Sequence, residues 1–570
     1  MNQSLHSLPR FFVTLAAALL VACGGGGGGS EGNSDKSANI PSPTGGGIAA
    51  TNAAYTLLAW NDLGMHCVDG KDYSVFSILP PYNNLHAQLV NRSQGGLVSN
   101  GVTLTYEAMA DATGAINTTS ISKTNFWTWM DKLFGASKAA DVGLKDNSTI
   151  SRTPRPLAFN VSHQWFEAEG IPVTPYDDSG THNFYPMVKV VARDASGTVL
   201  ATARTVLPVS DEMSCKACHA SSTVNTAAKP VAGWVSDPDP EKDWKKNILR
   251  LHDQKKLGTP AFTSALNALG YNTSGLLATA LAGQPILCAS CHSSNALPGT
   301  GRAGISSLTQ ALHSLHAGVR DPVNQLTLDS SSNRSACYLC HPGSVTQCLR
   351  GPMGNAINAT TNLPSMNCQS CHGGMSVVGS PARIGWLNEP TCQSCHHDGV
   401  RELSGFTASG SPKTWADSRF ASNQNTPAAG LNLYRFSTGH GGLQCESCHG
   451  ATHAEYPSSH ANDNVLSQDL QGHAGTVNEC TACHVTVPNT VSGGPHGMHT
   501  TTSAWISNHR SAAKNNLAAC AYCHGPIYQG TALSQVKMSK TFSTERGPKA
   551  YAPGQQVGCY DCHNGPNGGD

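Results

Sequence analysis

The 570-residue sequence has few charged residues and no excess of either sign. Asp, Glu, Lys and Arg make up 13% of the chain, and 36 basic residues match 36 acidic ones. This balance argues against a nucleic-acid-binding protein, which would carry a basic face. Long hydrophobic runs are also missing, because none reaches the roughly 18 apolar residues of a transmembrane helix. What the chain has instead is 21 cysteines and 25 histidines. That is too many cysteines for an ordinary cytosolic enzyme, in a chain too long for a small disulfide scaffold.

The N-terminal residues are typical of an export signal. A twelve-residue apolar run from Phe11 to Ala22 follows Arg10 and leads into Cys23, which is followed by six glycines. The run has signal-peptide length and resembles the bacterial lipobox, which predicts lipidation of Cys23 and an outer-membrane anchor. We therefore expect a signal peptide at 1–22, a lipidated flexible tether at 23–50 and an exported protein. A plain secretory signal with a chance cysteine is the alternative.

Most cysteines belong to nine copies of one motif, Cys-x-x-Cys-His, all after residue 210. The cysteine pairs are Cys215 with Cys218, Cys288 with Cys291, Cys337 with Cys340, Cys368 with Cys371, Cys392 with Cys395, Cys445 with Cys448, Cys480 with Cys483, Cys520 with Cys523, and Cys559 with Cys562. The histidines that complete them are His219, His292, His341, His372, His396, His449, His484, His524 and His563. Residue frequencies predict about 0.03 chance copies, so the repeat is not accidental.

The motif is the attachment signature of c-type haem. Two thiols three residues apart reach the two vinyl groups of one porphyrin, and the next residue places an imidazole under the iron as its proximal ligand. Zinc sites pair two Cys-x-x-Cys knuckles without a histidine after each, and thioredoxin-type motifs occur once on a βαβ unit. The sequence therefore predicts nine haem c groups.

A second axial ligand distinguishes an iron that only passes electrons from an enzyme centre, which leaves one position open. Eleven further histidines follow residue 210, enough for nine irons. We expect the distal ligands among His252, His313, His316, His397, His440, His453, His473, His499 and His509; His460 and His496 are weaker candidates. Because His397 directly follows the proximal His396, it points away from that iron and could cap a neighbouring haem. For each candidate, a hydrogen-bonded surface or core histidine is the alternative.

Residues 51–210 contain no haem motif and have a β pattern. Apolar residues alternate from Val102 to Ala108, and segments 185–192 and 198–207 flank the turn at 194–197, as in a hairpin. A short packed helix is expected at Phe126–Met130 with Leu133 and Phe134. We predict a mostly-β, sandwich-like domain. Its histidines, His66, His86, His163 and His182, are expected to be structural, or in one case to reach across and cap a haem.

Residues 211–570 provide 40 residues for each of the nine motifs, too few for nine separate cores. Porphyrin faces must then supply most of the buried surface, so we predict short helices and irregular loops wrapped on a chain of closely packed haems. One helix is expected to begin at Asp239-Pro240 and to carry His252. The two remaining cysteines, Cys67 and Cys348, are predicted to form a disulfide between the two regions; two buried thiols are the alternative.

Three segments carry a resemblance to a known family: Ala59–Cys67, Cys337–Ser344 and Pro495–His499. They look like a group of large lipoprotein multihaem cytochromes c, similar to outer-surface cytochromes of dissimilatory metal-reducing bacteria. The resemblance implies electron transfer at the outer membrane or cell surface. It also implies periplasmic or outer-membrane electron-transfer proteins as partners, a porin or other cytochromes among them, and metal oxide as a terminal acceptor.

The main functional hypothesis is a nonahaem electron-transfer lipoprotein, mostly with two histidines per iron and no substrate chemistry of its own. The alternative is a multihaem reductase of a small nitrogen or sulfur oxyanion, with one open iron. No motif here ends in Lys, the variant that nitrite-reductase-like enzymes typically use at the active haem. A third hypothesis makes residues 51–210 a docking module for a porin or surface partner.

Overall fold

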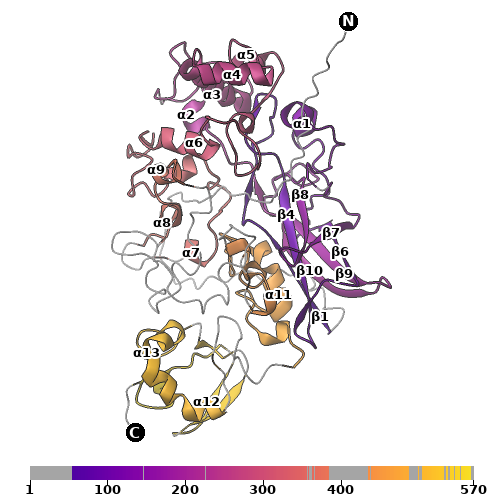
Figure 1. The fold of residues 1–570 in the computed structure, drawn as a ribbon, viewed down its shortest axis with the longest axis vertical. Helices are drawn as coiled ribbons and strands as arrows, with labels where there is room; N and C mark the ends of the chain where they lie inside the picture. Colours follow the sequence, from indigo (N-terminus) through magenta and orange to yellow (C-terminus); the bar gives the residue numbers. More distant parts are fainter. Residues whose placement is uncertain are drawn as a thin grey trace.

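The computed structural model describes residues 54–383 and 434–566, with gaps at 146, 225, 356, 358–361, 365, 437, 439, 487–498, 500–502, 532–533, 537–538, 545 and 553. The predicted signal peptide and tether, with Cys23, lie outside the described residues, as does His496. The fifth motif (Cys392, Cys395 and His396) and the neighbouring His397 also lie outside them. Within the described parts, a β-rich region is followed by a helical region that carries the motifs (Figure 1).

One antiparallel sheet forms most of the β-rich region, in the order β1-β4-β8-β7-β6-β9-β10, with β5 paired to β4. The strands are β1 (Tyr55–Asn61), β4 (Asn83–Asn91), β5 (Gly96–Val98), β6 (Val102–Met109), β7 (Arg155–Asn160), β8 (Trp165–Ile171), β9 (Met187–Asp194) and β10 (Val199–Val206). The two ends of this order, β1 and β10, pack against each other, so the sheet curves almost into a barrel. This corrects the sandwich-like expectation: a twisted sheet of this size curls round a single core instead of splitting into two layers.

The local β predictions are confirmed. Strand β6 buries alternate residues, including Leu104 and Tyr106. Strands β9 and β10 form the expected hairpin, and the Asp194 carboxylate accepts the backbone N–H groups of Ser196 and Thr198 at 2.9 Å each. The interior of the sheet is filled by small and branched apolar side chains: Leu57, Ala59, Leu85, Leu89, Val188, Val190, Leu200 and Ala203, joined from the helical region by Leu466.

The helical region has short helices and long connections, as expected. The helices are α2 (Lys216–His219), α3 (Pro240–Lys256), α4 (Pro260–Leu269), α5 (Leu276–Leu281), α6 (Leu308–His316), α7 (Pro352–Asn355), α8 (Cys368–His372), α9 (Met375–Val378), α10 (Cys445–His449), α11 (Val465–Gln471), α12 (Ser503–Asn508) and α13 (Arg510–His524); α1 (Phe126–Phe134) belongs to the β-rich region. Helix α1 confirms the predicted packed helix, with Phe126, Met130 and Leu133 buried. Of the helices in the described ranges, none is long and apolar enough to cross a bilayer.

Helix α3 begins where the sequence predicts. The Asp239 carboxylate accepts the backbone N–H of Glu241 at 2.9 Å, and Pro240 occupies the first turn, where its missing N–H is not needed. In the helical region, regular sheet in the described residues is limited to the two-residue strand β12 (Ile286–Leu287) and the hairpin of β13 (Lys540–Thr544) with β14 (Gly547–Tyr551).

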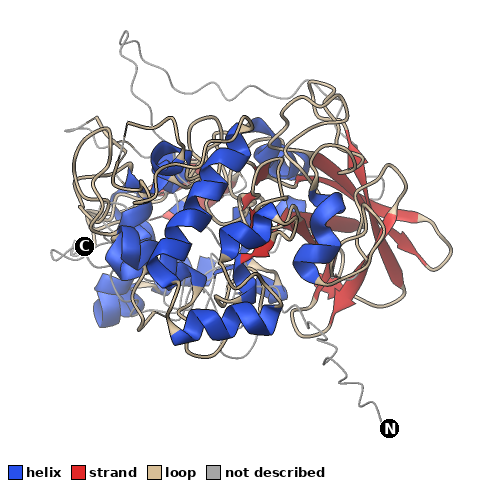
Figure 2. Cartoon of the chain, turned by 90° about the horizontal axis from the view of Figure 1, so that it is seen from above, coloured by secondary structure: helices blue, strands red, loops and turns tan. Residues whose placement is uncertain are grey.

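One short parallel ladder joins the two regions: β3 (Phe76–Ser77) pairs with β12. A second, of β2 (His66–Cys67) with β11 (Val209–Ser210), lies at the end of the β-rich region, next to the boundary. One apolar cluster includes Trp60 and Trp165 from the sheet together with Leu287, Phe436 and Leu443 from the helical region. The predicted boundary at residue 210 is therefore crossed by a shared core, and helices and strands lie directly against each other (Figure 2).

Lys245 of α3 is a buried cation in this interface. Its side chain is fully buried, and its ammonium group donates to the backbone carbonyls of Asp69, at 3.0 Å, and Asp72. We expect Lys245→Met to lower the free energy of unfolding by about 2–4 kcal/mol, because charge-assisted bonds are lost at a buried site. The matched control is Lys242→Met on the same helix. Lys242 is partly exposed and lies 3.9 Å from its carboxylate neighbours, so its replacement should cost under about 1 kcal/mol. Urea titration followed by circular dichroism checks both values, and equal losses would contradict this role.

Candidate metal centres

Eight of the nine motifs lie in the described residues, each on a helical turn. Four are in α2, α8, α10 and the end of α13; the other four sit on 3-10 turns at Cys288–Ser290, Ala336–Leu339, Cys480–Ala482 and Cys559–Asp561. The turn is closed by the histidine N–H, which donates to the carbonyl of the first cysteine, for example His341 to Cys337 at 2.9 Å and His484 to Cys480 at 2.8 Å. Residues i, i+3 and i+4 share one face of such a turn, so both sulfurs and the imidazole face the same side.

The second cysteines of the first, fourth and eighth motifs lie on α-helices and are partly exposed. Cys218 belongs to α2, Cys371 to α8 and Cys523 to the last turn of α13, each one position before its motif histidine. In the fourth motif the first cysteine, Cys368, is buried, whereas Cys371 keeps part of its surface accessible. Covalent attachment of haem at Cys218, Cys371 and Cys523 stays a prediction, because it rests on the motif and its spacing.

Seven motif histidines face a second imidazole across a gap. The pairs, with ring-centroid distances, are His219–His316 (6.3 Å), His252–His292 (6.4 Å), His313–His341 (6.2 Å), His372–His453 (6.0 Å), His440–His484 (6.0 Å), His499–His524 (6.3 Å) and His509–His563 (5.9 Å). Rings that stack directly are much closer: the centroid of His460 lies 3.5 Å from that of Tyr185, and His86 lies 4.2 Å from Trp165. The seven pairs therefore leave room between the rings.

The width of that gap fits a metal ion. With metal–nitrogen bonds of about 2.0 Å, and each nitrogen about 1.1 Å from its ring centroid, two imidazoles on one iron have centroids about 6.2 Å apart. The observed distances of 5.9–6.4 Å lie on both sides of this value. Two cysteines accompany every pair, at the spacing that porphyrin attachment requires. The donor set and its spacing therefore fit a haem with two axial histidines.

The tautomer of several of these imidazoles is fixed by hydrogen bonds. The Nδ1 atoms of His292, His313, His316, His509, His524 and His563 lie 2.6–2.8 Å from backbone carbonyl oxygens. A carbonyl oxygen only accepts, so Nδ1 carries the proton and Nε2 keeps its lone pair. Hydrogen bonding of this kind orients metal-bound histidines and increases their basicity.

Burial favours the neutral form of several of the paired imidazoles. Loss of solvation, together with the opposite histidine of each pair, lowers the pKa of His219 and His252 to about 4 and that of His341 to about 3. These imidazoles are therefore deprotonated at neutral pH. A neutral imidazole is the form that binds a metal ion.

Helix α6 serves two pairs at once. His313 faces His341 of the third motif, and His316, one turn later, faces His219 of the first. Each donates its Nδ1 hydrogen to the carbonyl four residues earlier, on Thr309 for His313 and Leu312 for His316. This helix therefore fixes the first and third centres relative to each other.

Contacts between motifs define their order in space. Cys288 of the second motif and Cys215 of the first pack against the same apolar cluster; the backbone N–H of Ser214 donates to the carbonyl of Cys340 of the third at 3.2 Å; and Cys337 hydrogen-bonds Cys368 of the fourth. His453, which faces His372 of the fourth motif, directly follows the sixth, and Cys448 of the sixth lies beside Cys483 of the seventh. The described motifs thus follow the order second, first, third, fourth, sixth, seventh.

The eighth and ninth motifs form a further group. Cys520 lies near Cys559, and His524 donates to the carbonyl of Val557 at 2.7 Å. Trp505, which the sequence reading missed, stacks on His499 with a centroid distance of 4.4 Å and lies 6.3 Å from His509. From α2 through α8 to α13, the motif helices follow the long axis of the molecule (Figure 1).

Two other distal candidates lie away from the paired imidazoles. His473 is about half exposed, and its Nε2 lies 3.8 Å from Glu479. His460 stacks on Tyr185 instead of facing a motif histidine. In the sixth motif, the proximal His449 ends α10.

Three of the four histidines of the β-rich region have local partners that fit a structural role. His66 contacts Asp62 at 2.8 Å, and His182 contacts Asp211 at 3.2 Å. His163 packs against the rings of Trp165, at 4.5 Å, and Phe436, at 5.2 Å. These contacts agree with the structural role expected for them.

Cys67 and Cys348 are both buried in the same apolar cluster. Ser210, the strand partner of Cys67, contacts Thr346 at 3.0 Å between hydroxyl groups, so the two chain segments are neighbours. A disulfide between these cysteines stays a prediction.

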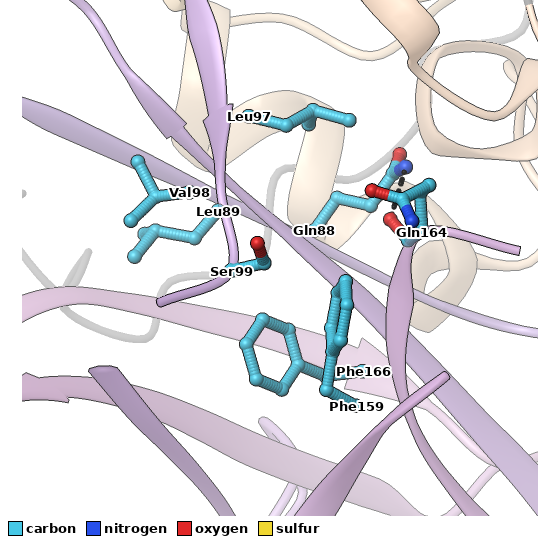
Figure 3. A pocket seen from close by; sticks show the side chains of 8 residues that line it. All are labelled: Gln88, Leu89, Leu97, Val98, Ser99, Phe159, Gln164 and Phe166. Carbon is cyan, nitrogen blue, oxygen red and sulfur yellow. Dashed lines mark hydrogen bonds between the residues drawn. The ribbon is translucent and has the colours of Figure 1, made fainter. Parts of the chain in front are cut away.

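A small recess opens on the sheet near β5. Its lining consists of Gln88, Leu89, Leu97, Val98, Ser99, Phe159, Gln164 and Phe166, with the amide of Gln88 donating to the carbonyl of Gln164 at 3.1 Å (Figure 3). None of these side chains is acidic or basic. The recess itself therefore offers no charged ligand for a metal ion.

No protein-family model matches the chain, and no curated protein or solved structure is significantly similar to it. The chemistry of the site therefore has to be argued from its own geometry. That geometry combines eight described Cys-x-x-Cys-His turns with seven facing histidine pairs.

Proposed function

We propose that the protein transfers electrons through nine covalently bound c-type haems, most of them ligated by two histidines. The observation that supports this most directly is the set of seven imidazole pairs with centroids 5.9–6.4 Å apart, each beside a cysteine pair. A chance arrangement of histidines would not place a distal imidazole at one bonding distance from so many motif histidines.

The role of the chain is to hold each ligand pair unchanged while charge moves. A bound haem supplies reversible one-electron chemistry at its iron, which cycles between ferric and ferrous. Burial favours the neutral form of imidazoles such as His219, and Nδ1 bonds to backbone carbonyls orient others, such as His316 and His524. Because the ligands come from rigid helices and turns, the geometry changes little between oxidation states.

The contacts that link the second motif to the seventh, and the eighth to the ninth, support a path for electrons along the molecule. The second motif, beside α3–α5, marks one end of the described series, and the ninth, beyond α13, marks the other (Figure 1). A path of this length suits a carrier that connects partners at its two ends. We propose periplasmic or outer-membrane electron-transfer proteins as partners, including a porin or other cytochromes, and metal oxide as the final acceptor. A lipid on Cys23 would anchor the protein to the outer membrane.

The test is the haem content and spin state of the purified protein. We expect about nine haem irons per chain and a low-spin ferric spectrum, with no carbon monoxide binding after reduction, because both axial positions are taken. Pyridine haemochrome analysis, electron paramagnetic resonance and difference spectra measure these quantities. A high-spin fraction of about one haem in nine that binds carbon monoxide would instead favour the oxyanion reductase.

A further inference from the structure

A second type of metal site is suggested by one face of the curved sheet, on strands that carry no Cys-x-x-Cys-His motif. His86 on β4 lies directly opposite Glu167 on β8 in the antiparallel ladder, and Glu169 follows two residues later. Residues i and i+2 of a strand point to the same face, so all three side chains share it. One potential ligand atom from each lies within 4.8 Å of the other two.

His86 is the unusual member of this cluster. Its side chain is only 2% exposed, and neither ring nitrogen has a hydrogen-bond partner. One face of the ring is covered by Trp165 at 4.2 Å. A buried imidazole without hydrogen-bond partners lowers the stability of the fold, because each of its polar nitrogens has lost water without gaining a protein partner. A bound cation would satisfy one of these nitrogens.

Both carboxylates also bond to side chains outside this cluster. Glu167 accepts from the Asn160 amide at 3.1 and 3.0 Å and from the Trp165 indole N–H at 2.6 Å. Glu169 is buried and forms an ion pair with Lys145. Outer bonds of this kind orient carboxylate ligands and leave lone pairs available for a metal. Two carboxylates against one lysine also leave a local charge of −1, which a divalent ion would reverse.

We propose that His86, Glu167 and Glu169 bind one divalent first-row transition metal ion, with Zn²⁺ as the probe. The imidazole nitrogen disfavours Ca²⁺ and Mg²⁺, which prefer oxygen ligands alone. An ion with bonds of about 2.1 Å holds its ligand atoms up to about 4.2 Å apart, so small side-chain rotations close the site. The bound ion links β4 to β8 where the sheet packs against the helical region. This proposal does not depend on the haem assignment.

The experiment measures zinc bound to the purified full-length protein after incubation with Zn²⁺ and exhaustive dialysis. Zinc is determined by mass spectrometry and chain concentration by amino-acid analysis, so the haem irons do not enter the ratio. The variants are His86→Ala and the near-isosteric Glu167→Gln. The matched control is Glu107→Gln on β6, where Glu107 pairs with Lys189.

We expect about one retained Zn²⁺ per chain in the unaltered protein and in Glu107→Gln, and at least a tenfold reduction in both site variants. Circular dichroism identifies any variant that fails to fold; Glu167→Gln, which keeps the shape of the side chain, then decides the result. No retained zinc in the unaltered protein would overturn the proposal. Equal retention in all variants would also overturn it, because the zinc would then be bound elsewhere.

Discussion

Replacing His316 with alanine is expected to turn about one-ninth of the haem high-spin and to create one carbon monoxide site per chain. The reason is that His316 faces His219 alone, at 6.3 Å between centroids, while its neighbour on α6, His313, faces His341. Removing the imidazole leaves the first iron without its distal ligand and the other irons unchanged. Electron paramagnetic resonance and the carbon monoxide difference spectrum of the reduced protein measure the fraction.

The control for this variant is His473→Ala. His473 is about half exposed, has its Nε2 nearest Glu479 and faces no described motif histidine, so its removal should leave the spin state unchanged. The double variant His313→Ala/His316→Ala should double the high-spin fraction, because each histidine of α6 serves a different centre. An unchanged spectrum in His316→Ala, or an equal change in His473→Ala, would contradict the assignment.

Replacing Arg350 with methionine is expected to lower the free energy of unfolding by about 3–5 kcal/mol. The guanidinium is fully buried and bonds both oxygens of the Asp463 carboxylate, at 2.6 and 2.8 Å. Removal of one partner leaves an uncompensated charge in the core. The pair also connects the loop after the third motif to the loop after the sixth, where the His453 carbonyl accepts the N–H groups of Arg350 and Gly351.

The matched control is Arg204→Met, which breaks the more exposed pair of Arg204 with Asp469. Surface pairs of this kind contribute about 0–1 kcal/mol, so the control should lose little. The double variant Arg350→Met/Asp463→Leu should recover part of the loss, since no buried charge remains unpaired. Urea titrations give the three values, and equal losses in both single variants would contradict a special role for the buried pair.

The sequence predicts which residues form each motif better than it predicts which histidine faces that motif. The motif spacing predicts which residues attach a haem, because three side chains must share one helical turn. The histidine that faces each motif depends instead on contacts between residues far apart in the sequence. His440 lies five residues before Cys445 but faces His484 of the following motif, and His509 precedes Cys520 but faces His563. His473 has a similar position before Cys480, yet faces a carboxylate.

In the β-rich region, alternation predicted strands and the hairpin because it reports which face of each strand is buried. It could not distinguish a sandwich from a nearly closed sheet, since both bury alternate residues. The contact between β1 and β10, the two ends of the sheet, decides this. The cluster of His86 with Glu167 and Glu169 could not be predicted from the sequence either, because it depends on the register between β4 and β8.

Some of the facing histidines precede their motif in the sequence and others follow it, and this difference has a consequence for assembly. An exported chain emerges from the translocation channel starting at its N-terminus, so a ligand that precedes its motif is already outside when the haem is attached. His252 precedes the second motif, and His313 precedes the third. The fourth motif has its partner, His453, beyond two later motifs. Under the proposed function, its coordination would be completed only after much more of the chain has crossed the membrane, so the centres would mature in an order different from that in which their cysteines appear.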